Sequence, residues 1–154
     1  MQTNWLIVAD EAVAHIFQWQ GASRRLEEVE TLTHPAAHAQ EADLRRDAQG
    51  RQTQGRSAAN AGRPMSSVTS SAGLDAVHGE AVQFARRVAE RLGRAQTEGG
   101  FQRLKIAAAP RFLGLLRQEL PPQVSALVQE EVDKDLVHEK REDLERRFLG
   151  EPVR

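Results

Sequence analysis

The sequence predicts an α/β fold with a mixed five-stranded sheet, in the order β-β-β-α-β-α-β-α, and with helices on both faces. Two apolar runs, residues 4–8 and 106–109, are too short for helices and are typical of strands buried on both faces. Pro110 follows the second run directly and begins an amphipathic helix. With 154 residues, the chain is expected to form a single domain over residues 1–154.

The first three strands are predicted to form an antiparallel meander. The β-branched and aromatic run at residues 4–8 is followed by a tight turn at Asp10 and Glu11. Residues 12–19 alternate between two faces, and residues 26–33 alternate less regularly. The short connections between these runs favour antiparallel neighbours.

A long flexible insertion loop is predicted at residues 34–77, where large apolar side chains are rare and no period is sustained. From residue 45 to residue 63 this loop carries Asp47 as its single acid. Its arginines are Arg45, Arg46, Arg51, Arg56 and Arg63. Glycine-spaced arginines suit contacts to the phosphates of RNA, which position the nucleic acid without reading its sequence.

Two observations limit this interpretation of the loop. No aromatic residue is interleaved with the arginines, so base stacking is not supported. The alternative is a solvated loop whose arginines pair with acids such as Asp43 and Asp47.

Arg111, just after the predicted fourth strand, is the one polar group at that strand end able to meet an anion.

The second half of the chain alternates helices and strands. An apolar stripe over residues 81–95 predicts a helix, which Gly99 and Gly100 end. Residues 101–109 return as the central strand, and the helix that begins at Pro110 follows.

Residues 124–132 fit a helix and a strand equally well by periodicity. We favour a helical turn near Val124 and a short strand over residues 127–133. A charged helix over residues 138–149 ends the chain. Because strands joined through a helix run parallel by a right-handed crossover, the complete layout is that of the ribonuclease H-like folds.

Nucleases with that layout hold two metal ions between carboxylates on the first strand, first helix and fourth strand. Asp10 ends the first strand, and Glu80 or Glu90 lies on the helix, but the fourth strand ends in alanines and Pro110. His34 and His38 have the spacing of zinc ligands, without a cysteine or third histidine nearby. The sequence therefore predicts no metal site and no nuclease activity, and Asp10 is interpreted as a turn residue.

Other signals of catalysis or targeting are missing from the sequence. It contains no nucleophile elbow, phosphate-binding Walker loop or dinucleotide fingerprint, so no catalytic residue and no cofactor is predicted. A net charge of −1 gives no global attraction to nucleic acid. There is no cysteine, signal-like N-terminus or membrane span, so we expect a cytoplasmic protein; its oligomeric state is left open.

Several sequence strings resemble the bacterial host attachment family, named "protein required for attachment to host cells", over nearly the whole chain. The strings are Asn4-Trp5-Leu6-Ile7-Val8-Ala9-Asp10, Ala14-His15-Ile16-Phe17, His34-Pro35, Asp43-Leu44, Gly50-Arg51, Phe84-Ala85, Pro110-Arg111-Phe112-Leu113-Gly114 and Glu131-Val132-Asp133-Lys134-Asp135-Leu136. The resemblance implies a non-enzymatic role in attachment, with a host-cell or envelope component as partner.

That family is similar in fold to the central domain of eukaryotic and archaeal class-one peptide release factors. In those proteins the loop between the third strand and the first helix carries a Gly-Gly-Gln tripeptide that promotes peptidyl-tRNA hydrolysis. The matching loop here has Gly50-Arg51-Gln52 and Gln54-Gly55-Arg56, and no Gly-Gly-Gln. The resemblance therefore implies, as the alternative function, a non-catalytic module that binds RNA or the ribosome.

Overall fold

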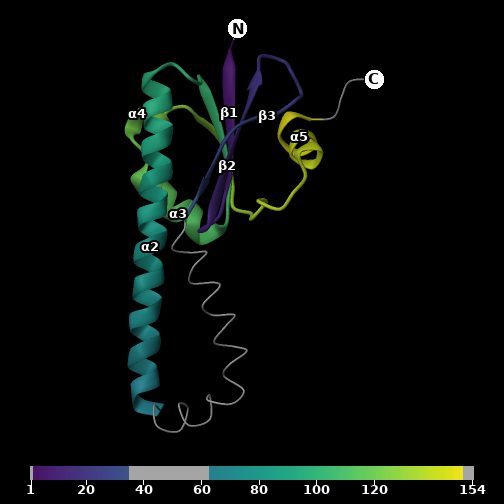
Figure 1. The fold of residues 1–154 in the computed structure, drawn as a ribbon. Coiled ribbons are helices and arrows are strands. Elements are labelled where there is room, and N and C mark those ends of the chain that lie inside the picture. The colour runs from purple at the N-terminus through teal and green to yellow at the C-terminus, as the bar shows by residue number, and fades with distance from the viewer. Residues whose placement is uncertain (1, 35–62, 151–154) are drawn as a thin grey trace.

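A five-stranded mixed sheet forms the centre of the protein, with the strand order β3-β2-β1-β4-β5 (Figure 1). The computed structural model describes residues 2–34 and 63–150, and within them the side chains of all residues except 63–77. The α/β class and the mixed sheet predicted from the sequence are confirmed.

The sheet combines an antiparallel half with a parallel half. Strands β1 (Thr3–Ala9), β2 (Val13–Gln20) and β3 (Glu27–Thr33) pair antiparallel in sequence order. Strand β4 (Arg103–Ala108) pairs parallel with β1, and β5 (Val128–Val132) pairs parallel with β4. Strands β4 and β5 are joined through α3 and α4, and β3 is joined to β4 through α2, so each strand reached through a helix runs parallel to the strand before it, as the crossover rule requires.

The central strand β1 is buried on both faces, as its apolar run predicts. Trp5 and Ile7 belong to the core cluster on one face of the sheet. Leu6 and Val8 belong to the cluster on the other face. Since successive side chains of a strand point to opposite faces, an uninterrupted apolar run is the pattern that this position needs.

Helices cover both faces of the sheet (Figure 1). One face is covered by α2 (Arg63–Thr97), α3 (Pro110–Glu119) and the short α4 (Pro122–Ser125). The other face is partly covered by α5 (Arg141–Leu149). This arrangement confirms the two helical layers expected from the sequence.

Helix α3 follows the sequence pattern closely. Pro110 is its first residue, and Phe112, Leu113 and Leu116 are buried against the sheet. The ambiguous stretch after it resolves into α4 followed by β5, the alternative that we favour from the sequence. Helix α5 begins at Arg141 rather than at residue 138.

Helix α2 corrects the predicted extent of the insertion loop. The sequence places residues 34–77 in a loop, whereas residues 63–77 belong to α2. The apolar stripe begins at Ala81, and periodicity detects only the part of a helix that packs against a core. Once the packed part has formed, further residues add to it at one backbone hydrogen bond each, without needing a stripe. The remainder of the predicted loop, residues 35–62, lies outside the described residues.

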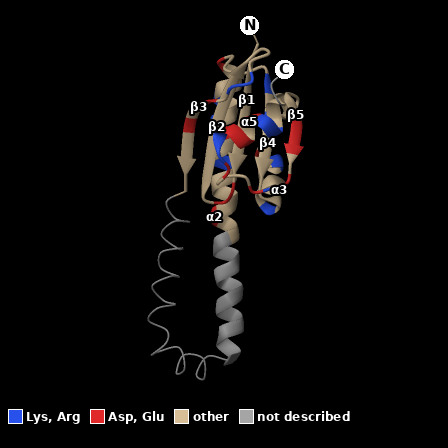
Figure 2. Ribbon diagram, turned by 90° about the vertical axis from the view of Figure 1, so that its right-hand side faces the viewer, with Lys and Arg blue, Asp and Glu red and all other residues tan. Residues whose placement is uncertain are grey.

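The two edge strands carry acidic side chains, which Figure 2 shows on β3 and β5. Glu30 of β3 accepts a hydrogen bond from Arg91 of α2, with Nε 2.8 Å from Oε1. Glu131 of β5 accepts one from Arg117 of α3 at 2.7 Å, and this hydrogen bond and the negative charge raise the pKa of Arg117. Charged edges of this kind oppose pairing with the edge strand of another molecule.

Candidate functional site

The predicted insertion leaves the sheet at the end where β1, β3 and β4 finish, which we call the carboxyl end. Strands β1 and β3 run in the same direction, because each is antiparallel to β2, and β4 is parallel to β1. Ala9, Thr33 and Ala108 therefore lie at one end of the sheet. Ligand sites of α/β proteins are common at this end, which makes it the first candidate for a site.

Asp10, the candidate metal ligand, is a turn residue. Its Oδ1 accepts hydrogen bonds from the backbone N–H groups of Ala12 and Val13, both at 2.8 Å. The Asp10 N–H in turn donates to the Val13 carbonyl at 2.9 Å. The turn predicted at this position is confirmed. Among residues 2–34 and 63–150, no group of three or more His, Cys, Asp or Glu side chains is placed to hold a metal ion.

His34 directly follows β3 and packs against α2. Its backbone N–H donates to the Ala12 carbonyl at 2.9 Å, and its ring lies 5.4 Å from that of Phe84 between centroids. Its Nε2 is 3.9 Å from Oε2 of Glu80, and both atoms are buried without a hydrogen-bond partner in the described structure. Arg87 donates to the Thr33 carbonyl at 2.6 Å. These contacts fix the point at which the chain leaves the sheet for residue 35.

The arginines predicted from the sequence as anion-binding residues divide into three groups. Arg45, Arg46, Arg51 and Arg56 lie outside the described residues. Arg63 is the first residue of α2, about 25 Å along the helix axis from Glu80 at about 1.5 Å per residue. Arg111 is exposed in the first turn of α3, beside the end of β4. The structure therefore does not bring Arg63 and Arg111 together.

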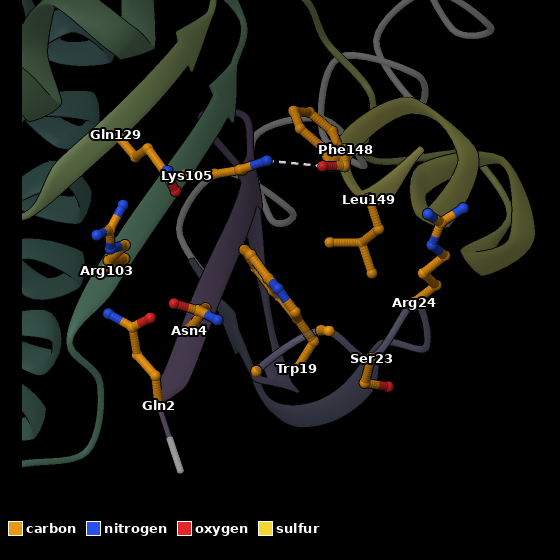
Figure 3. Close-up of a pocket in the computed structure, with 12 residues that line it drawn as sticks. Gln2, Asn4, Trp19, Ser23, Arg24, Arg103, Lys105, Gln129, Phe148 and Leu149 are labelled. Atoms are coloured by element: carbon orange, nitrogen blue, oxygen red, sulfur yellow. Dashed lines mark hydrogen bonds between the residues drawn. The ribbon is translucent and has the colours of Figure 1, made fainter. Parts of the chain in front are cut away.

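A pocket of about 390 Å³ lies at the opposite end of the sheet, where β1 and β4 begin (Figure 3). We call it the amino-end pocket. Its floor follows the pairing register across three strands, since Asn4 of β1 pairs with Trp19 of β2 and with Arg103 of β4. Lys105 continues this floor two residues further along β4.

Two parts of the chain form the walls of the amino-end pocket. One is the turn after β2, from Gly21 to Arg24, and the other is the C-terminal end of α5, with Phe148 and Leu149 (Figure 3). The pocket is basic, because Arg24, Arg103 and Lys105 line it and no acidic side chain among the described residues does.

Polar groups in this pocket lack partners. Asn4 is 5% exposed, and its Oδ1 has no hydrogen-bond partner among the described residues; within the same part of the chain, Nη1 of Arg24 is buried without a partner as well. A buried polar atom left unpaired costs about 1–3 kcal/mol, so such atoms are uncommon without a functional reason. Lys105 is better satisfied, because its Nζ donates to the Phe148 carbonyl at 2.6 Å and lies 3.4 Å from Glu130.

The sequence interpretation missed this pocket, although a signal for it was present. Arg103 and Lys105 alternate with Leu104 and Ile106, a period of two that places both cations on one face of β4. The prediction treated the alanine-rich second half of this strand as representative of all of it. That Asn4 and the turn at Gly21 would meet these cations depends on strand register, which the sequence does not show.

Comparison with known protein families identifies the family to which the chain is related. A family model described as "Protein required for attachment to host cells" matches residues 5–148. The chain belongs to this host attachment family. The matched range spans every described strand and helix of the chain except the first two residues of β1 and the last residue of α5. No curated protein sequence matches it. None of its described helices has both the length and the apolar character needed to cross a membrane.

Proposed function

We propose that this protein is a non-enzymatic binding module whose partner is RNA and which associates with the ribosome. The observation that carries the proposal is the long α2. Its first buried side chain among those described is Ala81, and the helix begins at Arg63, so it extends well past the carboxyl end of the sheet (Figure 1). This helix forms an arm at the end of the sheet where the chain continues from β3 into residues 35–62, which we call the arginine-rich segment.

Both ends of the arginine-rich segment are attached to ordered structure. His34 and Arg87 hold its start on the sheet and α2, and its end continues into α2 at Arg63. Residues 45–63 contain Arg45, Arg46, Arg51 and Arg56 and a single acid, Asp47. Arginine binds phosphate oxygens through two parallel hydrogen bonds, and released counterions favour such contacts.

The proposal includes the relationship to release factors. The order of elements, with the arginine-rich segment between β3 and the first long helix, supports a ribonuclease H-like domain similar to the release-factor central domain. The matching loop contains Gly50-Arg51-Gln52 and Gln54-Gly55-Arg56 and no Gly-Gly-Gln tripeptide. A side chain at Arg51 restricts the backbone that two glycines leave free, so binding rather than hydrolysis is the proposed role.

Attachment to host cells is the second candidate function, and membership of the family favours it. In that case the partner is a host-cell or envelope component. Fractionation of the native cells separates the two candidates: a protein exposed on the cell surface supports attachment by direct contact, whereas one that co-sediments with ribosomes supports the RNA-binding module.

The decisive experiment measures co-sedimentation with ribosomes, and binding to a single-stranded RNA, across a range of salt concentrations. Arg45, Arg46, Arg51 and Arg56 are changed together to alanine. The matched control removes the same charge elsewhere, with Arg94, Arg141, Arg146 and Arg147 changed to alanine, all of which are exposed.

Each lost phosphate contact lowers the slope of log K against log salt by about 0.7 for a single strand, so four lost contacts lower it by about 3. The expected result is weak, salt-insensitive binding by the first variant and near wild-type binding by the control. Equal sedimentation of the first variant and the wild type would contradict the proposal.

A further inference from the structure

The amino-end pocket is the feature of the molecule that the proposed function leaves unused. It lies at the end of the sheet opposite the α2 arm, so its role does not depend on RNA binding by the arm (Figures 1 and 3). We propose that this pocket binds a small phosphate monoester with a hydroxyl-bearing organic part, such as a sugar phosphate or a nucleoside monophosphate.

The charge of the pocket indicates an anionic group. Arg24, Arg103 and Lys105 line the pocket, and the only ion pair that these three make among the described residues is that of Lys105 with Glu130. Lys105 uses one proton for the Phe148 carbonyl and directs another toward Glu130, which leaves its third donor unused. Arg103 is exposed, and its side chain makes no hydrogen bond or ion pair with the described residues, so its donors can meet a phosphate group.

The buried Asn4 indicates that the ligand carries a hydrogen-bond donor as well as an anionic group. Asn4 is 5% exposed at the floor of the pocket, between Trp19 and Arg103 (Figure 3), and no described residue donates a hydrogen bond to its Oδ1. A carbonyl-type oxygen needs a donor. The dianionic phosphate group of a monoester has no O–H, so a hydroxyl group of the organic part supplies the donor. The Gln2 and Gln129 side chains at the rim add further amide donors and acceptors.

The size and the apolar part of the pocket fit the same class of ligand. About 390 Å³ is within the range of small-molecule sites, and Trp19, Phe148 and Leu149 provide apolar surface beside the cations. Lys105 also lies 5.5 Å from the centroid of the Trp19 ring, which holds its charge beside this apolar surface.

The walls of the pocket are held in place before any ligand binds. The Gly21 N–H donates to the Gln2 carbonyl at 2.7 Å, and the Ser23 N–H donates to the Gln20 carbonyl at 2.8 Å. Helix α5 is tied to the sheet by the bond from Lys105 to Phe148, and Glu145 accepts the Leu26 N–H at 2.7 Å. A pre-formed site loses little conformational freedom on binding.

The test is calorimetric titration of the full-length protein at low salt with four probes: adenosine 5′-monophosphate, ribose 5-phosphate, inorganic phosphate and adenosine. We expect both phosphate monoesters to bind more tightly than inorganic phosphate, and adenosine not to bind. Arg103→Ala is expected to weaken binding of the monoesters by about 10- to 100-fold, as for the loss of a hydrogen bond to a charged group. Arg94→Ala, an exposed arginine of α2, is the matched control and should leave binding unchanged.

A second variant separates the two parts of the site. Asn4→Val should weaken binding of both monoesters more than binding of inorganic phosphate, because it removes the contact to the hydroxyl group of the organic part. In the folded wild type, nuclear magnetic resonance shifts on adding adenosine 5′-monophosphate should include the Trp19 indole N–H. The variant with Arg45, Arg46, Arg51 and Arg56 changed to alanine should bind the monoesters normally, so failure of the RNA proposal leaves this one standing.

Three outcomes would overturn the proposal. They are the absence of binding by both monoesters, equal binding of adenosine and its monophosphate, and unchanged monoester affinity in Arg103→Ala. Shifts that appear only at the carboxyl end of the sheet, around His34 and Arg111, would assign the phosphate to that end instead and equally overturn it.

Discussion

Replacing Asp10 with alanine should destabilise the protein by about 2–3 kcal/mol. The Asp10 Oδ1 accepts two backbone hydrogen bonds, from Ala12 and Val13, each 2.8 Å long and partly buried. A hydrogen bond to a charged group contributes about 1.5–3 kcal/mol, and partial access of water to this turn reduces the sum of the two. For a chain of this size the loss corresponds to a fall in melting temperature of about 5–10 °C.

Asp10→Asn is the control that separates a turn residue from a metal ligand. An asparagine keeps the oxygen that accepts both hydrogen bonds and loses only the charge, so we expect a loss of about 1 kcal/mol or less. Urea unfolding followed by circular dichroism measures both variants. Added Mg²⁺ should leave the melting temperature of the wild type and of Asp10→Asn unchanged. Equal destabilisation by both substitutions, or stabilisation of the wild type alone by Mg²⁺, would refute the interpretation of Asp10 as a turn residue.

Two further predictions concern other local contacts. Glu145→Ala should destabilise the protein by about 1–3 kcal/mol, because it removes the acceptor of the 2.7 Å hydrogen bond from the Leu26 N–H. Glu145→Gln keeps an acceptor, so its loss of unfolding free energy in urea should be less than half as large. Equal losses for the two variants would show that this hydrogen bond is not the cause. Gly114→Ala should stabilise the protein by about 0.5–1 kcal/mol, because Gly114 lies inside α3 and the new methyl group would enter open space. Gly99→Ala should destabilise the protein, because the φ of Gly99 is +74°. Differential scanning calorimetry measures both glycine variants, and a change of the same sign in the two would contradict this account.

The fold was predictable because its signals are local. The uninterrupted apolar run of β1 and the proline-led stripe of α3 each report burial through a period that is visible in the sequence. The extension of α2 from residue 77 back to Arg63 was not predictable in this way, because it has no stripe. The turn at Asp10 was predictable because an aspartate side chain bonds backbone groups two and three residues ahead of it.

The two candidate sites also differ in whether the sequence alone could predict them. The arginine-rich segment is a feature of composition, so the sequence alone draws attention to Arg45, Arg46, Arg51 and Arg56. The amino-end pocket is a feature of register, and its residues are far apart along the chain.

By itself, the sequence determined the α/β class, the pairing directions of the strands, the turn at Asp10 and the relationship to the host attachment family. These follow from alternation, helical stripes, turn chemistry and sequence strings, all of which act over a few neighbouring residues. Only the tertiary structure decided that Asn4, Trp19 and Arg103 share one row across the sheet. It also decided that the end of α5 stops beside that row, where the Asn4 Oδ1 is buried with no hydrogen-bond partner in the described part of the chain. The physical reason is that strand register and helix docking are set by the packing of the whole core, to which no short stretch of sequence refers.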